Sequence, residues 1–284
     1  MLVPRIDGET TLVGLVGHPV SHSLSPRMHN ASFAALGLNY VYVPLDVRPE
    51  GLEAAVRGLG ALGFRGFNVT MPHKEGVCAL VDRLDEAARV SGAVNTVVLE
   101  EDGVLLGMNT DGSGFLLACR ESGIDPAGKV VLVAGAGGAA AAVAVALLRE
   151  GVAGLRIANR SPERAERLRE RLGEKGRRVE VFPLSRVEEA AEGAHILVNA
   201  TYLGMHEGDP LPFPEGMLRE GVVVFDAVYR PGRGTALVRA ARERGLVAVS
   251  GELMLLYQGV EAQRVWTGVD PDVGAMRRAL SGGG

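Results

Sequence analysis

The chain has 284 residues, which suits about two domains, because single hydrophobic cores rarely grow beyond about 250–300 residues. Hydrophobic residues make up 47% and charged residues 23%, as in ordinary globular proteins, and a net charge of −4 argues against a nucleic-acid surface, which needs a basic face. The sequence starts without a signal-like apolar core, and no stretch reaches the ~18 apolar residues of a membrane span. We therefore expect a cytoplasmic protein with neither a membrane nor a nucleic acid as partner.

The first hundred residues predict an αβ domain with a mixed sheet. Short apolar and β-branched runs predict strands, and amphipathic runs between them predict helices. The expected strands are 12–17, 40–45, 65–69, 94–99 and 104–107, and the expected helices are 26–36, 50–59, 74–84 and 86–90. Glu101–Gly103 is typical of a hairpin turn, so the last two strands are expected to be antiparallel.

The rest of the chain alternates strands with helices, the pattern of a parallel sheet. The expected strands are 130–134, 155–159, 179–182, 195–201, 222–225 and 247–249. Helices are expected at 110–121, from 138 to about 149, after 161, at 253–266 and at 272–280.

Polar side chains follow the first strands, at strand ends where open αβ sheets bind ligands. Ser23 and Ser25 are two residues apart in an extended stretch, so their hydroxyls face the same side. They precede a helix that starts at Pro26, and a helix N-terminus favours a carboxylate. The alternative is that Ser25 only caps this helix.

Lys74 follows Asn68 and Thr70, which share one face of the strand end. In the first turn of a helix a cation opposes the helix dipole, so this position needs a compensating interaction. A lysine can exchange a proton, which arginine cannot do at useful pH. The alternative is a lysine that only faces solvent.

Asn95 and Asp111 complete the polar set. Asp111 stands at a predicted helix start and would serve as its N-cap. If the fold brings Lys74 and Asp111 together, they make a plausible pair for handling a proton.

A glycine-rich turn joins strand 130–134 to the following helix. In dinucleotide sites the first glycine allows the tight turn, the second lets backbone approach a pyrophosphate, and the third position stays small for packing. Gly135, Gly137 and Ala140 fill these positions, and free N–H groups at the helix start would hold the phosphates. An ordinary strand-to-helix turn is the alternative. We favour a cofactor site formed by Gly135, Ala136, Gly137, Gly138 and Ala139.

The next strand indicates which dinucleotide is bound. NAD sites carry Asp or Glu near its end, whereas this strand ends in Asn159, Arg160 and Ser161. An acid would repel a 2′-phosphate, and an arginine can pair with it through two donors. The alternative is that Arg160 and Arg164 only flank a solvated helix start. We expect NADP(H).

Nine motifs occur in the order found in shikimate dehydrogenases. They are Ser23–Pro26, Asn68–Lys74, Gly92–Thr96, Asn109–Gly112, Gly135–Ala139, Asn159–Ser161, Asn199–Thr201, Asp226–Tyr229 and Met254–Gln258. The chain resembles this family along essentially its whole length. The resemblance implies an oxidoreductase of aromatic amino acid biosynthesis that reduces 3-dehydroshikimate to shikimate with NADPH, reversibly. It also implies a monomer or homodimer whose partner is this small-molecule substrate, with no bound metal.

The resemblance further implies two αβ domains with a cleft between them. Residues 1–110 with 250–284 would form the substrate-binding domain, and residues 111–249 a Rossmann-like NADP-binding domain. Ser23, Ser25 and Tyr229 would hold the substrate carboxylate, Thr70, Asn95, Asp111 and Gln258 its ring hydroxyls, and Lys74 and Asp111 would be catalytic. Thr201 and the stretch from Gly251 to Met254 would flank the nicotinamide.

Two departures from the family pattern affect the nicotinamide side. Glu252 stands where an apolar residue is commoner, and the stretch Pro231–Thr235 is one residue longer than usual. Two other functions remain open: an NAD-dependent quinate/shikimate dehydrogenase, disfavoured by Arg160, and a non-catalytic NADP-sensing regulator. Retention of both Lys74 and Asp111 argues against the regulator.

Overall fold

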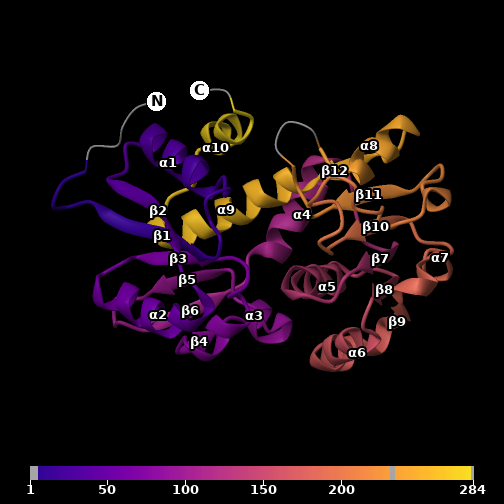
Figure 1. The fold of residues 1–284 in the computed structure, drawn as a ribbon, viewed down its shortest axis with the longest axis horizontal. Helices are drawn as coiled ribbons and strands as arrows, with labels where there is room; N and C mark the ends of the chain where they lie inside the picture. Colours follow the sequence, from indigo (N-terminus) through magenta and orange to yellow (C-terminus); the bar gives the residue numbers. More distant parts are fainter. Residues whose placement is uncertain (1–5, 231–233, 283–284) are drawn as a thin grey trace. The chain divides into compact units, whose positions relative to one another are not determined.

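The chain forms two compact units. Figure 1 shows their helices and strands, coloured by position in the sequence. The computed structural model describes residues 6–230 and 234–282. The first unit contains the described residues up to Gly114 and from Leu255 onward, and the second contains Phe115–Met254. The two crossings fall inside helices α4 (Asp111–Glu121) and α9 (Gly251–Thr267), so both connections are helical.

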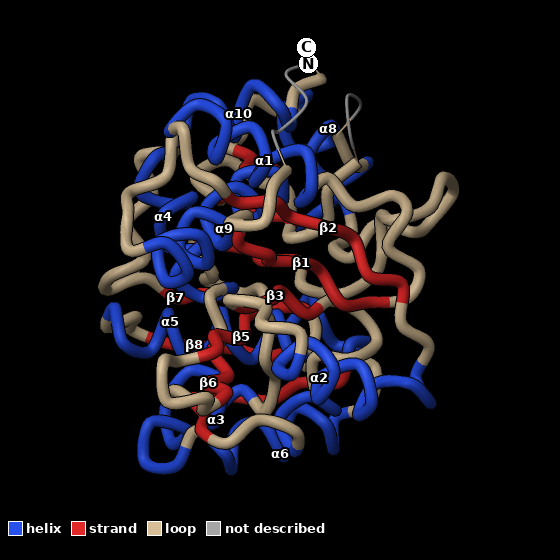
Figure 2. Tube along the Cα trace, turned by 90° about the vertical axis from the view of Figure 1, so that its left-hand side faces the viewer, coloured by secondary structure: helices blue, strands red, loops and turns tan. Residues whose placement is uncertain are grey.

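The first unit is built on a mixed sheet, as the sequence predicts. Its strands are β1 (Thr11–Gly17), β2 (Tyr40–Asp46), β3 (Gly66–Val69), β4 (Arg83–Leu84), β5 (Thr96–Leu99) and β6 (Leu105–Met108), in the order β2-β1-β3-β5-β6-β4. Strand β1 is parallel to β2 and β3, and β5 is antiparallel to β3 and β6. The red strands of this sheet can be followed in Figure 2.

Helices cover both faces of this sheet because its strands are apolar on both sides. The helices of this unit besides α4 and α9 are α1 (Ser25–Leu36), α2 (Leu52–Ala61), α3 (Glu86–Ser91) and α10 (Val273–Leu280). Val13 and Leu15 of β1 belong to one apolar cluster with Phe33 of α1 and Trp266 of α9. Val16 lies in a second cluster with Val56 of α2. Successive residues of β1 point to opposite faces of the sheet, so Leu15 and Val16 belong to separate cores.

Trp266 joins segments that are far apart in sequence. It is buried, and its indole N–H donates to the carbonyl oxygen of Val97 at 3.0 Å. A Cβ atom on Gly66 would lie 2.3 Å from the indole nitrogen, so only glycine leaves room for the ring. The glycine at the start of β3 is thus explained by packing.

The second unit contains an all-parallel sheet with strand order β12-β11-β10-β7-β8-β9. Its strands are β7 (Val130–Ala134), β8 (Gly154–Asn159), β9 (Val179–Pro183), β10 (Ile196–Asn199), β11 (Val223–Asp226) and β12 (Ala248–Ser250). Its helices are α5 (Gly138–Glu150), α6 (Pro162–Arg171), α7 (Val187–Ala190) and α8 (Ala236–Glu243). This is the doubly wound order of dinucleotide-binding folds, which bind ligands where the strand order reverses, here between β7 and β10.

Three elements differ from the sequence expectation. The helix expected at 74–84 is wrong: a 3₁₀ turn at Gly76–Ala79 and the short strand β4 replace it, because Arg83 and Leu84 pair with Leu106 and Gly107 of β6. Helices α7 and α8 were not expected, although α8 is amphipathic and packs against β11 and β12. Among the described residues, no helix combines the length and the apolar character that crossing a bilayer requires.

Candidate active site

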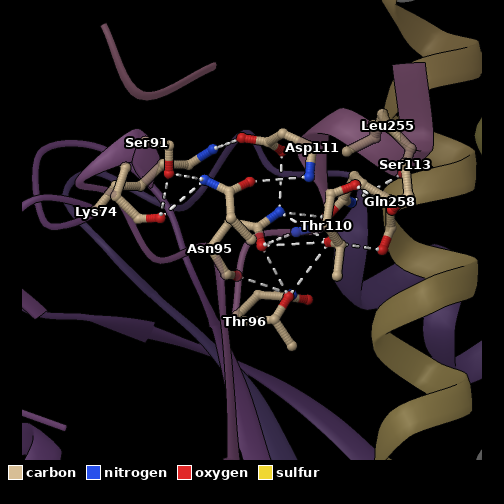
Figure 3. Close-up of polar contacts among 12 residues, drawn as sticks. Lys74, Ser91, Asn95, Thr96, Thr110, Asp111, Ser113, Leu255 and Gln258 are labelled. Atoms are coloured by element: carbon tan, nitrogen blue, oxygen red, sulfur yellow. Dashed lines mark hydrogen bonds and ion pairs between the residues drawn. The ribbon is translucent and has the colours of Figure 1, made fainter. Parts of the chain in front are cut away.

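Lys74 and Asp111 meet in the first unit. Lys74 Nζ donates to Asp111 Oδ2 at 2.6 Å, and the side chains are 23% and 8% exposed (Figure 3). The Lys74 carbonyl accepts from Val94 N–H at 2.8 Å, which fixes the backbone of the turn. Lys74 precedes the 3₁₀ turn and not a helix, so the expected conflict with a helix dipole does not arise. Lys74 is paired with the Asp111 carboxylate, so the alternative of a lysine that only faces solvent is wrong.

The Asp111 carboxylate is oriented by the loop before α4. Asn109 Oδ1 accepts from Asp111 N–H at 3.0 Å, so the asparagine caps the backbone. The carboxylate itself does not cap α4. Its second oxygen, Oδ1, accepts from Asn95 Nδ2 at 2.9 Å. The N-cap alternative for Asp111 is therefore wrong, and its charge is directed at Lys74 and Asn95.

Asn95 is the centre of the polar cluster in Figure 3. Its Nδ2 lies 2.9 Å from Thr110 Oγ1 and 3.4 Å from Gln258 Oε1, in addition to Asp111. Its Oδ1 accepts from Thr110 N–H at 2.8 Å. Asn95 is 2% exposed, so its amide is committed to protein partners.

Gln258 reaches this cluster from α9. Its Nε2 donates to the Leu255 carbonyl at 2.9 Å. A Cβ atom on Gly114 would lie 2.7 Å from the backbone nitrogen of Gln258, so glycine allows α4 and α9 to approach closely. Glycine at position 114 is thus a packing requirement that places the Gln258 amide beside Asn95.

The two serines lie at the start of α1, but their structural roles differ from expectation. Helix α1 begins at Ser25 itself, with Leu24 at the cap position and no side-chain cap. Ser25 does not cap the helix, because it is already the first helical residue. Ser23 Oγ accepts from Ser25 N–H at 3.3 Å. Thr70 lies just after β3, half-buried, with its N–H bonded to the Val16 carbonyl at 2.9 Å.

The glycine-rich turn of the second unit has the geometry of a phosphate site. Gly135 has φ of +116°, and a Cβ there would lie 2.6 Å from the Ala200 carbonyl oxygen. A Cβ on Gly137 would meet no atom within 4 Å, so this backbone faces open space. Ala140 is 1% exposed and packs inside. The turn and the first residues of α5, with Ala136, Gly138 and Ala139, can therefore accept a pyrophosphate at the N-terminus of the helix.

The end of β8 carries the residues expected at the adenosine ribose. Asn159 Nδ2 donates to the Ser161 carbonyl at 2.8 Å, which closes the turn before α6. Arg160 and Arg164 are both exposed, so their guanidinium groups are accessible to a ligand. The first turn of α6 carries one acid, Glu163.

A second polar cluster joins the carboxyl ends of β10 and β11. Asp226 is fully buried and accepts from Asn199 Nδ2 at 2.8 Å, from Val228 N–H at 3.0 Å and from Thr235 Oγ1 at 2.5 Å. Burial raises the pKa of Asp226 to about 6, against the lowering effect of these donors. Asn199 Oδ1 in turn accepts from Thr201 Oγ1 at 2.7 Å, so the position of Thr201 depends on Asp226.

Tyr229 follows the second cluster in sequence, and Gly251 and Met254 lie at the start of α9. Burial, and secondarily the Glu252 carboxylate, raise the pKa of Tyr229, which keeps its hydroxyl protonated as a donor. A Cβ on Gly251 would lie 2.5 Å from the Ala227 carbonyl oxygen, so packing requires glycine there, and Met254 is buried. Of the longer stretch Pro231–Thr235, residues 231–233 lie outside the described residues.

Three family models match the chain. The shikimate dehydrogenase substrate binding domain matches residues 15–97, shikimate / quinate 5-dehydrogenase residues 117–205, and the shikimate 5′-dehydrogenase C-terminal domain residues 251–280. A shikimate dehydrogenase (NADP(+)) of Rubrobacter xylanophilus is 83% identical over 284 residues, 100% of each chain. The chain belongs to the shikimate dehydrogenase family. The resemblance inferred from the nine motifs is confirmed.

Solved structures of this family agree with the fold. A shikimate dehydrogenase crystal structure in complex with NADP+ matches with a TM-score of 0.91 and 39% identity, over 99% of this chain and 98% of that chain. A second, from Thermus thermophilus in complex with NADP(H) and shikimate, matches with a TM-score of 0.85 and 39% identity, over 96% and 100%. The expected fold class of a substrate domain and a Rossmann-like domain is therefore confirmed.

Some residues of the two clusters were missed by the sequence reasoning. Thr110 and Asp226 fell within recognised motifs but received no role. Tyr42 received none either, although its hydroxyl donates to Asn68 Oδ1 at 2.8 Å. An isolated tyrosine in an apolar strand gives no signal of a polar partner two strands away.

Proposed function

We propose that this chain catalyses the reversible reduction of 3-dehydroshikimate to shikimate with NADPH. The observation that carries the proposal is the contact of 2.6 Å between the ammonium of Lys74 and the buried carboxylate of Asp111. Family membership supports the substrate, and the curated relatives carry NADP(+) in their names. The first unit is proposed as the substrate-binding domain and the second as the NADP-binding domain.

The polar lining of the first unit suits a small anion with three hydroxyl groups. Ser23 and Ser25 are proposed to hold the carboxylate near the N-terminus of α1. Thr70, Asn95, Asp111 and Gln258 are proposed to hold ring hydroxyls. Asn95 would exchange its longest contact, that of 3.4 Å to Gln258 Oε1, for a substrate hydroxyl. Tyr229 belongs to the second unit, and its contact with the carboxylate stays a prediction.

The cofactor residues of the second unit fit NADP(H). The open space at Gly137 and the N-terminus of α5 suit a pyrophosphate, and the accessible guanidinium of Arg160 suits a 2′-phosphate. Thr201, Gly251 and Met254 are proposed to contact the nicotinamide. When bound, NADPH supplies the hydride that a carbonyl reduction needs.

Lys74 is proposed to supply the proton. Asp111 holds the ammonium group in place, and Lys74 Nζ protonates the carbonyl oxygen as it becomes a hydroxyl. In the oxidative direction the uncharged form of the same nitrogen accepts the proton of the substrate hydroxyl. Asp111→Asn should slow both directions, because it removes the group that orients the ammonium.

The test follows shikimate oxidation by the absorbance of NADPH from pH 6 to 10. We expect Lys74→Ala to lower kcat by about 10²–10⁴-fold while shikimate still binds. Lys74→Arg keeps the positive charge beside Asp111 but cannot release a proton at these pH values, so it should be similarly inactive. Lys129→Ala, which removes an exposed lysine elsewhere, is the matched control.

A Lys74→Ala enzyme within about threefold of wild type would exclude the proposed role of Lys74. A wild-type protein that binds NADP+ but turns over no shikimate would favour the regulator. Faster turnover of quinate with NAD+ would favour the quinate enzyme. The cytoplasmic location and the monomer or homodimer state remain predictions.

A further inference from the structure

A line of buried polar side chains continues beyond Asp111 into the first unit. Asn95 Oδ1 accepts from Thr96 Oγ1 at 3.0 Å, and Thr96 Oγ1 accepts from Asn68 Nδ2 at 3.0 Å. Asn68 Oδ1 accepts from Tyr42 Oη at 2.8 Å. Tyr42, Asn68, Asn95 and Thr96 are all at most 4% exposed. Water therefore competes little with these bonds.

The sheet brings these side chains onto one face. Tyr42 of β2 is paired with Val13 of β1, and Asn68 of β3 with Leu15, two residues along the same strand. Residues two apart on a strand point the same way, so the phenol crosses β1 to reach Asn68. Asn68 lies directly opposite Thr96 on antiparallel β5. This line of hydrogen bonds therefore depends on the register in which β2, β1, β3 and β5 pair.

Backbone groups fix the direction of every bond in this line. Asn95 Oδ1 must be the oxygen, because it accepts from Thr110 N–H at 2.8 Å. Asn68 Nδ2 must be the nitrogen, because it donates to the Asn95 carbonyl at 3.0 Å. Thr96 Oγ1 accepts from that nitrogen, which leaves its own proton for Asn95 Oδ1. Tyr42 must then donate to Asn68 Oδ1, so all donors point toward Asp111.

The far end of the line is also held in place. Burial raises the pKa of the Tyr42 hydroxyl well above its usual range, against a smaller lowering effect of the Ser25 side chain, so the phenol keeps its proton. The Tyr42 ring stacks on buried His29, with centroids 4.5 Å apart and planes at 11°. Ser25 is a proposed carboxylate contact and Asp111 a proposed catalytic group. The line thus connects the two ends of the proposed substrate site through the interior.

We propose that Tyr42 is a positioning residue whose hydroxyl, through Asn68, Thr96 and Asn95, holds the Asp111 carboxylate in the orientation that aligns Lys74. Aligned hydrogen bonds in a buried chain polarise one another, so each donor strengthens the next. Asn95 Nδ2 then donates more strongly to Asp111 Oδ1, and Oδ2 is left to the ammonium. The inference rests on the proposed function of Lys74 and Asp111.

The test removes one hydroxyl at a time from the same strand. Tyr42→Phe loses the donor to Asn68 but keeps the ring that stacks on His29. Tyr40→Phe is the matched control, because the Tyr40 hydroxyl donates to the Trp266 carbonyl at 3.4 Å, outside the line. We expect Tyr42→Phe to lower kcat for shikimate oxidation about three- to tenfold, as for one buried hydrogen bond. The KM for NADP+ should stay unchanged, and Tyr40→Phe should keep the wild-type kcat.

A double variant separates positioning from general stability. If Tyr42 acts through Asp111, adding Tyr42→Phe to Asp111→Asn should change kcat by less than about twofold. The same factor in both backgrounds, or equal kcat for Tyr42→Phe and Tyr40→Phe, would overturn the inference. A wild-type enzyme without shikimate turnover would instead overturn the proposed function.

A second pair keeps the test decisive if Tyr42→Phe folds poorly. Thr96→Val is nearly isosteric but breaks the line, whereas Thr96→Ser keeps the hydroxyl. Thr96→Val should lower kcat about three- to tenfold, as for Tyr42→Phe, and Thr96→Ser should keep most of the wild-type kcat. Equal kcat for the two variants would contradict the line, because Thr96→Ser keeps the hydroxyl that Thr96→Val removes.

Discussion

Arg160 is the residue on which the choice of cofactor depends. It stands at the end of β8, where NAD enzymes carry an acid, and its side chain is exposed. We expect Arg160→Ala to lower the affinity for NADPH about tenfold or more, because a charge-assisted contact to the 2′-phosphate is lost. The affinity for NADH should stay nearly unchanged. Titration calorimetry with both cofactors measures the two effects separately.

Arg178 offers a control of equal charge. It precedes β9, which is parallel to β8, so Arg178 lies at the amino end of these strands and Arg160 at their carboxyl end. Arg178→Ala should leave both affinities unchanged. If Arg160→Ala weakens both cofactors equally, the guanidinium does not read the 2′-phosphate.

Ser23 combines two roles that the sequence assigned to different residues. From the sequence, capping of α1 by Ser25 was the alternative to carboxylate binding, and Ser23 had no part in the cap. The structure instead has Ser23 Oγ accepting the N–H of Ser25. We expect Ser23→Ala to raise the KM for shikimate and to lower stability modestly, by about 0.5–1 kcal/mol. Ser21→Ala, an exposed serine of the same loop, should do neither. A loss of stability with an unchanged KM would assign Ser23 a structural role alone.

Among the elements, the sequence predicted those whose signal is local. The glycine-rich turn needs a positive φ at Gly135 and a small residue at Ala140, and both requirements are visible in the residue types. The absence of a helix at 74–84 was not predictable in this way, because β4 exists only through its pairing with β6.

In the candidate active site, too, residues with a local signal were predicted and contacts that depend on strand pairing were not. Lys74 and Asp111 were found from residue type and family motif, 37 positions apart. The line from Tyr42 to Asn95 was not found, since it requires the register of β2, β1, β3 and β5. Registers between strands distant in sequence are set by packing, which no short motif encodes.

The junction of β10 and β11 is expected to respond to pH through Asp226. Burial raises its pKa from 3.8 to about 6, so between these values the folded state holds a proton that the unfolded chain has released. The contribution of Asp226 to the free energy of unfolding is therefore complete below pH 4 and is lost as the pH rises through 6. The Asp226→Asn variant lacks this proton, so its Tm should rise relative to wild type between pH 4 and 6.

Asp209 supplies the contrast for this measurement. Backbone hydrogen bonds from His206 and Gly204 hold the pKa of this half-buried carboxyl below its usual value, so it stays ionised across the interval. The difference in Tm between Asp209→Asn and wild type should therefore stay constant from pH 4 to 6. A flat difference for Asp226→Asn as well would show that Asp226 is ionised throughout.

At the scale of the whole molecule, stability of the first unit depends on segments from both ends of the chain. Gly66→Ala would place a methyl group 2.3 Å from both the Trp266 indole nitrogen and the Val97 carbonyl. We expect it to destabilise the unit by about 1–3 kcal/mol or more. Urea unfolding followed by the emission of the single tryptophan measures this directly.

Gly60→Ala is the paired control. Gly60 lies within α2, and an added Cβ would meet nothing within 4 Å. Alanine is a better helix former, so the urea midpoint should stay equal or rise. Equal midpoints for the Gly66 and Gly60 variants would mean that α9 can move away from β3 without cost.

The split first unit has a consequence for synthesis on the ribosome. The slot formed by Gly66 and Val97 emerges early, but the indole that fills it is encoded 169 residues after Val97. The second unit is contiguous, so all of its residues are synthesised before that indole. The nucleotide-type sheet is therefore synthesised in full at a stage when α1 already packs on this face of the first sheet but the cover that Trp266 of α9 provides is still missing.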